Sequence, residues 1–301
     1  MKWRGLVDRW LRRAWRPETG RMAKLTGHRP ISVVTGASEG IGLAIASELA
    51  RRGDALLLVA RDEARLDEAA TRIRTAFAGA NIDTLALDLS AADAVARLRE
   101  RIEQADAYIH TLVNNAGIGI AGEFGDQSPD DIDRLIGLNV TAATRLMHAV
   151  LPAMLVRGTG GIINIASLGG FAPGPYQAAY YASKAYLISL TRAVAWEIRG
   201  RGVRLCVVAP GPVETRFHAR MGTDNALYRW LLPALTPQRV ARSALFGYDW
   251  GRTLVVPGLL NRIVALLMNI LPPSLLTPII AVLLRPRNPA PPKIKPAASE
   301  N

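Results

Sequence analysis

The sequence has little cysteine and little histidine, and both shortages limit the chemistry open to it. Cys206 is the single cysteine among 301 residues, so a disulfide framework and a cysteine-based metal site are excluded, and a reducing, cytoplasmic setting fits. The four histidines stand at positions 28, 110, 148 and 218, without the spacing of metal ligands. A mechanism built on a bound metal is therefore not expected.

Acidic residues are scarce at the two ends of the chain. The net charge is +12, but residues 1–30 carry nine Lys or Arg against two acidic residues, and residues 285–301 carry four against one. The stretch 31–284 has 24 basic and 22 acidic residues and is nearly neutral. A globular body that binds DNA or RNA is expected to carry its own basic stripe. No nucleic-acid partner is therefore predicted.

The basic N-terminal end lacks the long apolar run of a secretory signal. In "MKWRGLVDRWLRRAWR" the tryptophans and leucines recur at helical spacing, and arginines fill much of the remainder. This pattern is typical of a basic amphipathic helix that lies on an anionic membrane surface.

Between the two ends, short apolar runs alternate with longer helical patterns. The predicted strands read ISVVTG, ALLLVA, IDTLALDLS, IHTLVNNAG, GGIINIAS, VRLCVVAPG and, after residue 252, TLVVPG. Strands that are apolar without alternation are buried on both faces, as in a parallel sheet covered by helices. The predicted fold class is therefore α/β, with a single doubly wound parallel sheet and two terminal extensions.

A glycine-rich stretch, TGASEGIG at residues 35–42, directly follows the first predicted strand and opens a helix. Glycines let the backbone turn sharply and approach a pyrophosphate, and a helix N-terminus offers free N–H groups with a partial positive charge. Such a stretch alone is weak evidence for a ligand site. Its place between the first strand and the first helix of a βαβ unit, however, predicts a dinucleotide site.

The spacing TGxxxGxG, followed by NNAG at 114–117 and YxxxK at 180–184, resembles the classical short-chain dehydrogenase/reductase family over about residues 31–257. The resemblance implies one Rossmann-type domain that holds cofactor and active site together, and hydride transfer between a nicotinamide and an alcohol or carbonyl. The positions expected to contact the cofactor are Thr35, Gly36, Ser38, Gly40, Ile41, Gly42, Arg61, Asp88, Asn114, Ala116, Gly117, Tyr180, Lys184, Pro210, Gly211, Val213 and Thr215.

The choice between NADP(H) and NAD(H) depends on the charge after the second strand. An acidic residue there binds the ribose 2′-hydroxyl of NAD, whereas an arginine pairs with the 2′-phosphate of NADP. The sequence has Ala60 and Arg61 at this place, which favours NADP(H). Glu39 and Asp62 weigh against it, because NADP-preferring relatives often carry a basic residue before the second glycine. NAD(H) stays the alternative.

The stretch QAAYYASKAYL contains two tyrosines that could pair with Lys184. Tyr180 lies four residues and Tyr181 three residues before the lysine, so both share its helix face. A tyrosine with a pKa near 10 needs a nearby ammonium to act as an acid or base at pH 7. The resembled family has a serine thirteen residues before its catalytic tyrosine. That count reaches Ser167 from Tyr180 but Leu168 from Tyr181, so Tyr180 is the predicted catalytic residue.

The resemblance adds Asn139 as a fourth catalytic residue, which helps to hold a water that links the lysine to solvent. Tyr180 is expected to be the general acid in reduction and Ser167 a hydrogen-bond donor to the substrate oxygen. Lys184 is expected to lower the tyrosine pKa and to bind the ribose. By the same resemblance, Asp88 should contact the adenine.

Residues 216–237 take the place of the family's variable substrate lid and are rich in Leu, Phe, Tyr and Trp. Such a composition suits an apolar pocket, or simple packing against the core. The predicted function is NADPH-dependent reduction of a hydrophobic ketone or aldehyde, such as a ketoacyl, steroid-like or lipid-derived carbonyl. The alternatives are a dehydrogenase of a small polar or sugar-like alcohol, and a non-catalytic membrane-associated NADP(H) sensor, against which the intact catalytic set argues.

The predicted helix YYASKAYLISLTRAVAWEIRG is apolar around most of its circumference. A helix of this kind needs cover on two sides. One side is the sheet and, by resemblance, the other is often the same helix of a second subunit. A homodimer or higher homo-oligomer is therefore expected.

The C-terminal segment 259–284 has one charged residue, Arg262. The segment is long enough to span a bilayer, but Pro272 and Pro273 divide it into two pieces that are each too short. An interfacial or re-entrant hairpin is favoured over a transmembrane helix and over packing on the core or on a partner subunit. With the N-terminal segment, this predicts a peripheral protein at the cytoplasmic membrane surface. The expected organisation is a basic extension (1–30), a catalytic domain (31–258), an apolar membrane-interfacial segment (259–284) and a Pro-rich basic tail (285–301).

Overall fold

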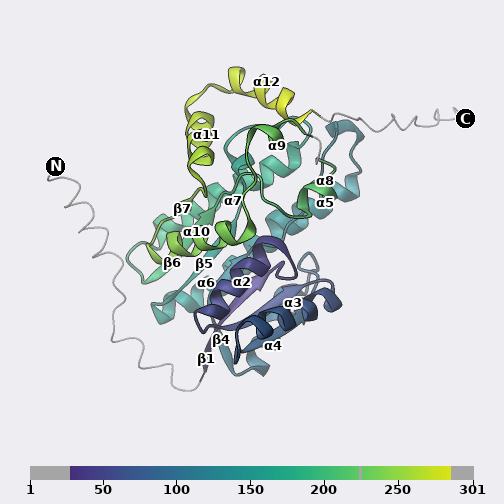
Figure 1. Cartoon of the computed structure of the whole chain (residues 1–301). Helices are drawn as coiled ribbons and strands as arrows, with labels where there is room; N and C mark the ends of the chain where they lie inside the picture. Colours follow the sequence, from purple (N-terminus) through teal and green to yellow (C-terminus); the bar gives the residue numbers. More distant parts are fainter. Residues whose placement is uncertain (1–27, 224–225, 286–301) are drawn as a thin grey trace, which may run out of the picture.

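A parallel sheet forms the centre of the computed structural model, which describes residues 28–223 and 226–285 (Figure 1). Within these residues seven strands pair in the order β3-β2-β1-β4-β5-β6-β7, and every pair is parallel. The strands are β1 (Arg29–Thr35), β2 (Ala55–Ala60), β3 (Ile82–Ala86), β4 (Ala107–Asn114), β5 (Gly160–Ile165), β6 (Val203–Val208) and β7 (Leu254–Val255). The order reverses between β1 and β4, the point at which doubly wound sheets bind ligands.

Helices cover both faces of the sheet, which makes the predicted α/β fold correct. One layer consists of α2 (Gly40–Arg51), α3 (Glu63–Ala76) and α10 (Pro237–Asp249), and the other of α4 (Ala94–Gln104), α6 (Ala143–Arg157) and α7 (Ala178–Glu197). Val33 packs in the second layer and its neighbour Val34 in the first, and both are fully buried. This double burial is the reason that β1 is a continuous apolar run.

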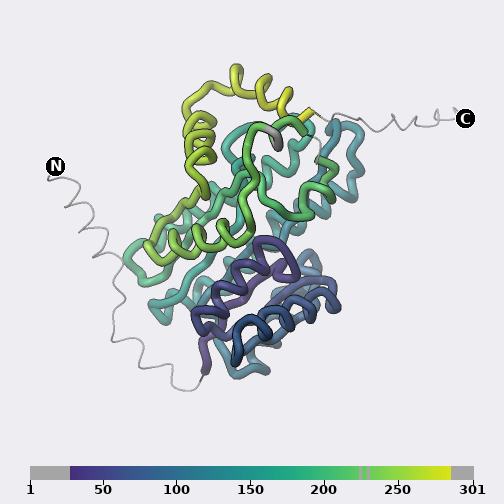
Figure 2. Tube along the Cα trace, viewed as in Figure 1, coloured from purple at the N-terminus to yellow at the C-terminus, as the bar shows by residue number. Residues whose placement is uncertain are grey.

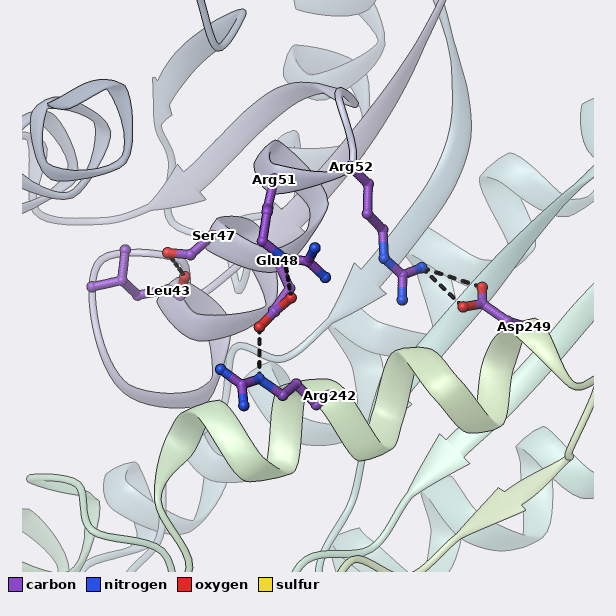
Figure 3. A network of polar contacts seen from close by, with 7 residues as sticks. All are labelled: Leu43, Ser47, Glu48, Arg51, Arg52, Arg242 and Asp249. Atoms are coloured by element: carbon purple, nitrogen blue, oxygen red, sulfur yellow. Dashed lines mark hydrogen bonds and ion pairs between the residues drawn. The ribbon is translucent and has the colours of Figure 1, made fainter. Parts of the chain in front are cut away.

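A network of charged side chains joins α2 to α10 (Figure 3). The Glu48 side chain, only 11% exposed, accepts from Arg51 Nε at 2.8 Å and from Arg242 Nε at 3.0 Å. Burial would raise the pKa of Glu48, but the hydrogen bonds from the two arginines outweigh it and the pKa lies below its ordinary value. A second ion pair, Arg52 with Asp249 at 3.0 Å, lies beside it. These contacts hold the layer that supports the glycine-rich loop.

The short helices that follow β6, and the two helices that follow β7, lie over the carboxyl ends of the strands. Short helices α8 (Phe217–Met221) and α9 (Tyr228–Leu231) form the segment expected to be a lid. Two further helices, α11 (Leu259–Ile270) and α12 (Pro273–Leu284), form an arch at the top of the view (Figure 2). Buried side chains of α12 pack against Tyr181 of α7 and Tyr228 of α9.

The two prolines at 272–273 separate α11 from α12 as the sequence predicts. No helix within 28–223 or 226–285 has the length and hydropathy needed to cross a membrane. The basic N-terminal segment up to residue 27 and the tail from residue 286 lie outside the described residues.

Candidate active site

A cavity of about 1060 Å³ runs along the carboxyl ends of the strands. Its floor is formed by the residues that end or follow the strands, among them Gly36, Ala60, Leu87, Asn115, Ile165 and Pro210. From the loop after β1, the cavity extends past α7 and α8 to the two C-terminal helices. The cavity therefore extends far enough to hold a cofactor and a substrate at the same time.

The glycine-rich loop adopts a backbone conformation that residues with a Cβ atom could not easily adopt. Gly36 and Gly40 have φ values of 62° and 58°, in the left-handed region. A Cβ on Gly42 would lie 2.3 Å from the Gly36 carbonyl oxygen. Glu39, the N-cap residue of α2, makes no side-chain cap hydrogen bond, so the first-turn N–H groups have no side-chain acceptor. The loop and helix end thus fit the pyrophosphate of a dinucleotide.

Thr35 and Asn115 brace this loop from below. The Thr35 hydroxyl donates to the Val113 carbonyl at 3.1 Å and accepts from the N–H groups of Asn115 and Ala116 at 2.9 and 3.0 Å. The Asn115 amide donates to the carbonyls of Thr35 and Gly36 at 3.0 and 3.1 Å. Thr35 does not itself line the cavity, and neither does Gly42. Both positions shape the loop.

Asn114 does not line the cavity, contrary to the expectation for the NNAG stretch. As the last residue of β4, it turns into the core, where its amide donates to Asn164 Oδ1 at 2.9 Å and to the Ala143 carbonyl at 3.3 Å. Asn115, Ala116 and Gly117 line the cavity instead. Asn115 was missed because nothing in an N-N dipeptide tells which side chain faces the core.

The end of the cavity next to β2 carries basic side chains. Ala60, Arg61, Asp62 and Arg65 line it. Asp62 is occupied as the N-cap of α3, since its carboxylate accepts from the Arg65 N–H at 3.1 Å. This capping role gives Asp62 a structural reason to follow Arg61 and reduces its weight against a phosphate ligand.

Asp88 lies outside the cavity, although it was expected to contact the adenine. Its neighbours Leu87 and Leu89 face the cavity, while the Asp88 carboxylate accepts from the Ser90 hydroxyl at 2.7 Å and the Ser90 N–H at 2.9 Å. The Ser90 hydrogen bond lowers the pKa of Asp88, and Arg61 and Arg134 add to this. Successive side chains point in opposite directions here, so Leu87 and Leu89 face the cavity and Asp88 points away from it.

Glu39 joins the glycine-rich loop to α8. The Arg216 Nη2 atom lies 2.6 Å from Glu39 Oε2, and Arg220 pairs with the other carboxylate oxygen. Thr215 approaches the same loop, since a Cβ on Gly40 would meet its methyl group at 3.1 Å. Glu39, Thr215 and Arg220 all line the cavity.

Ser167, Tyr180 and Lys184 meet on the wall of this cavity, as the sequence predicts for their placement. Ser167 follows β5, and its hydroxyl accepts from the Gly169 N–H at 3.1 Å. Lys184, 5% exposed, donates from Nζ to the Ile165 carbonyl at 3.1 Å, and Nζ lies 5.7 Å from the centre of the Tyr180 ring. The lysine and the tyrosine therefore share one buried pocket at the end of β5.

Burial shifts the pKa of both groups. It raises the pKa of the Tyr180 phenol to about 12, although a hydrogen bond with Ser167 acts in the opposite direction. It lowers the pKa of Lys184 to about 8. At pH 7 the tyrosine is protonated and the lysine is charged, which is the pair of states that proton donation to a carbonyl requires.

Asn139 lies behind the cavity wall rather than on it. It belongs to η3 (Gly137–Ala142), a π-helical turn between α5 (Pro129–Ile136) and α6, and such turns are frequent at functional sites. Its side chain exchanges two hydrogen bonds with the backbone of Ile118, at 2.9 and 2.8 Å. It also donates to the Ser183 hydroxyl at 3.1 Å, and Ser183 donates to the Tyr180 carbonyl at 2.7 Å.

Ser183 was missed because the YxxxK spacing does not specify the residues between the tyrosine and the lysine. Gly117 explains how close Asn139 comes to Lys184: an added Cβ would lie 3.0 Å from Asn139 Oδ1 and 3.4 Å from Lys184 Nζ. Tyr181 also lines the cavity, and its ring packs against Gly169 and α12. Burial raises its pKa far above the ordinary value.

The far end of the cavity is apolar. Its lining comes from α8, α9, α11 and α12 and includes Phe217, Met221, Leu231, Val264, Met268, Ile280, Leu283 and Leu284. Pro210, Gly211, Val213 and Thr215 line the part next to β6, as expected. The contribution of α11 and α12 was not foreseen, because an apolar segment that faces both inward and outward has no polar face to orient it.

Comparison with known proteins agrees with this geometry. The profile of the family described as short chain dehydrogenase matches residues 30–226. Ketoacyl reductase HetN of Nostoc sp. is 35% identical over 225 residues, which are 74% of this chain and 76% of that protein.

Two solved structures resemble the whole fold. A short-chain dehydrogenase from Sphingobium yanoikuyae, in complex with NADPH, has a TM-score of 0.70 and 38% identity, covering 79% of this chain and 92% of that one. The bulky-bulky ketone specific alcohol dehydrogenase from Comamonas testosteroni has a TM-score of 0.67 and 33% identity, covering 81% and 95%. The chain therefore belongs to the short-chain dehydrogenase/reductase family of oxidoreductases.

Proposed function

We propose that this protein is an NADPH-dependent reductase of a hydrophobic ketone or aldehyde, such as a ketoacyl, steroid-like or lipid-derived carbonyl. One observation carries the proposal: Ser167, Tyr180 and Lys184 lie in the middle of a cavity that has a phosphate-type loop at one end and an apolar chamber at the other. A cofactor and an apolar carbonyl that enter from opposite ends would meet at these three side chains.

The residues at the loop end suit NADP(H). Gly36, Ser38, Gly40 and Ile41 would hold the pyrophosphate at the start of α2, and Arg61 would pair with the 2′-phosphate. The complex of the Sphingobium relative with NADPH supports this choice. When bound, the reduced nicotinamide supplies the hydride for the carbonyl carbon. NAD(H) is the alternative, and Arg61 argues against it.

The proton follows a separate route through the chain's own residues. Ser167 donates a hydrogen bond to the carbonyl oxygen and polarises it, and Tyr180 gives the same oxygen its phenolic proton. The Lys184 ammonium stabilises the negative charge that forms on the tyrosine oxygen. Asn139 and Ser183 act one step further away, because their hydrogen bonds join the Gly117–Ile118 segment to the first turn of α7.

The substrate class follows from the far end of the cavity. Side chains from four helices line it mostly with carbon, with His218 and Tyr228 among the polar groups, which favours a bulky apolar group over a small polar or sugar-like alcohol. The Comamonas relative specific for bulky ketones and the Nostoc ketoacyl reductase support an apolar carbonyl. The non-catalytic sensor has no support in this geometry.

The proposal extends to assembly and location. Trp196 on α7 is 68% exposed, and the exposed rings of Phe246 on α10 and Trp250, which follows that helix, pack together at 5.5 Å. Exposed aromatic groups of this size favour a homodimer or higher homo-oligomer. The apolar surface of α11 and α12 favours peripheral contact with the cytoplasmic face of a membrane. Light scattering of the purified protein at micromolar concentration tests the oligomer, and a monomeric mass would contradict it.

The test of the chemistry follows NADPH absorbance with carbonyls of graded hydrophobicity. We expect kcat/KM to rise with the apolar size of the ketone. Tyr180→Phe should lose at least about 100-fold, the usual contribution of a general acid. Tyr181→Phe is the matched control and should keep wild-type activity, because it keeps the ring that packs against Gly169, Gly174 and α12 and removes only the hydroxyl. Full activity of Tyr180→Phe, or no oxidation of NADPH with any carbonyl despite measurable binding, would overturn the proposal.

A further inference from the structure

The helices α11 and α12 are apolar on two opposite faces. The inward face carries Val264, Ala265 and Met268 on α11 and Leu276, Ile280, Leu283 and Leu284 on α12, and most of these line the cavity or pack next to it. The inward face therefore needs no further partner.

The outward face carries large aliphatic side chains that nothing covers in the described part of the chain. They are Leu259, Leu260, Ile263, Leu266, Leu267 and Ile270 on α11, and Leu275, Ile279 and Val282 on α12. Exposure reaches 72% at Leu259 and 67% at Ile270. The spacing of three and four residues places each set on one side of its helix. Single exposed leucines are ordinary, but a continuous group on two adjacent helices marks an interaction surface.

The charges around this face have one sign. No acidic residue occurs between Asp249 and Glu300 in the sequence, and the described residues of that interval include Arg252, Arg262 and Arg285. The exposed Arg262 donates from Nε to the Val256 carbonyl at 3.0 Å, which keeps its charge at the edge of the apolar face. A second copy of this chain would bring like charges together here, while an anionic phospholipid surface would complement them.

The dimensions suit a surface rather than a span. Each helix has twelve residues and is about 18 Å long at 1.5 Å per residue, against about 30 Å for the hydrocarbon core of a bilayer. A pair of short helices with a wide apolar side lies in the interface and buries that side among the lipid chains.

We propose that the outward face of α11 and α12 docks on an anionic phospholipid bilayer, and that the inward face of the same helices forms the roof of the substrate chamber. An apolar carbonyl dissolved in the bilayer then reaches the chamber without crossing water. The docking stands on the exposed face and its charges. The delivery of substrate rests on the proposed function.

The experiment measures sedimentation of the full-length protein with vesicles of phosphatidylglycerol and phosphatidylcholine, and with vesicles of phosphatidylcholine alone. We expect strong binding to the anionic vesicles that salt weakens. The variant Leu266→Glu/Ile270→Glu places charges on the outward face and should reduce the fraction bound at least tenfold. Val156→Glu is the matched control, because Val156 is an equally exposed apolar residue on α6 and should bind like the wild type. All three proteins keep residues 1–27, so the N-terminal segment cannot explain the difference.

Thermal unfolding of both variants shows whether they are folded. If the double variant is not, Ile263→Gln and Leu275→Gln, single neutral changes on the same face, replace it and should still weaken binding. Wild-type vesicle binding by folded variants, or a full-length protein that stays in the supernatant at low salt, would overturn the docking. A dimer that becomes a monomer in the double variant would assign the face to a second copy and also overturn it.

Activity separates the two parts of the proposal. With a water-soluble ketone and no vesicles, the double variant should match the wild type. With a long-chain ketone presented in vesicles, it should be at least several-fold slower. Vesicle binding without turnover of any carbonyl would refute the proposed function and leave the docking standing. Equal turnover of the long-chain ketone by both proteins would refute the delivery.

Discussion

Replacement of Lys184 by Met is expected to lower activity and raise stability at the same time. Nζ lies 5.7 Å from the centre of the Tyr180 ring. Two unit charges at that separation interact by about 3 kcal/mol at an effective dielectric constant of about 20. Removing the ammonium should therefore lower kcat/KM for carbonyl reduction about 10-fold if half of the phenolate charge has formed in the transition state, and about 100-fold if nearly all of it has.

The same ammonium opposes folding. The pKa of Lys184 falls from 10.5 to about 8 in the folded protein, and at about 1.4 kcal/mol per pKa unit the buried charge costs about 3 kcal/mol at pH 7. The hydrogen bond to the Ile165 carbonyl offsets about 1 kcal/mol. Methionine has a similar length and no charge, so the variant should unfold several degrees higher at pH 7. This advantage should shrink as the pH rises from about 8 to 10.5, where the folded wild type has already lost the proton.

Two assays check this reasoning. The first compares pH profiles of kcat/KM: the wild type should lose activity as the pH rises through about 8, and Lys184→Met should be flat there. The second compares thermal unfolding. Wild-type kcat/KM in the variant at pH 7, or a lower unfolding temperature, would refute the account of Lys184 as a buried cation that serves Tyr180.

Three further predictions concern the cofactor end and the support of the loop. Arg61→Asp should raise the KM for NADPH at least tenfold and improve the use of NADH, measured by steady-state kinetics with both cofactors; an unchanged preference would remove Arg61 from the site. Glu48→Ala should lower the free energy of unfolding in urea by about 1–2 kcal/mol, because its arginine partners are largely exposed. Since the pKa of Glu48 is lowered, this contribution is present at neutral pH and lost as the pH falls through the folded pKa, so the two proteins should converge in acid. Gly42→Ala should weaken NADPH binding more than tenfold by fluorescence titration while the protein stays folded, because the new methyl group would lie 2.3 Å from the Gly36 carbonyl oxygen.

The sheet could be predicted because its strands carry strong signals: unbroken apolar runs, separated by helical patterns of the right length. The direction in which a single side chain points is harder to predict from the sequence. Asn114 and Asn115 are identical in type and adjacent, yet one turns into the core and the other into the cavity, since the chain leaves β4 between them. Asp88 and Leu89 show the same limit at the end of β3.

The roof of the chamber shows a different limit of prediction from the sequence. The sequence predicts two short apolar pieces around Pro272 and Pro273, and the structure has them as α11 and α12. Which residues face inward depends on contacts with Tyr181 and Tyr228, both far away in the chain. A pattern that is apolar all round contains no information about such partners, so Val264 and Met268 could not be placed in the site from sequence.

The ion pairs of Glu39 change the electrostatic effect of that residue on the glycine-rich loop. Taken alone, a carboxylate at the entrance of the glycine-rich loop repels phosphate, but Arg216 and Arg220 turn it into a cluster of net charge +1. Arg216 is the N-cap residue of α8 and Arg220 lies within that helix, so the charge at the entrance of the loop depends on the position of α8. Because the two arginines are more than half exposed, dissolved salt screens these ion pairs. The affinity for a phosphate-bearing ligand should therefore fall as the ionic strength rises, partly because salt weakens ion pairs within the protein itself.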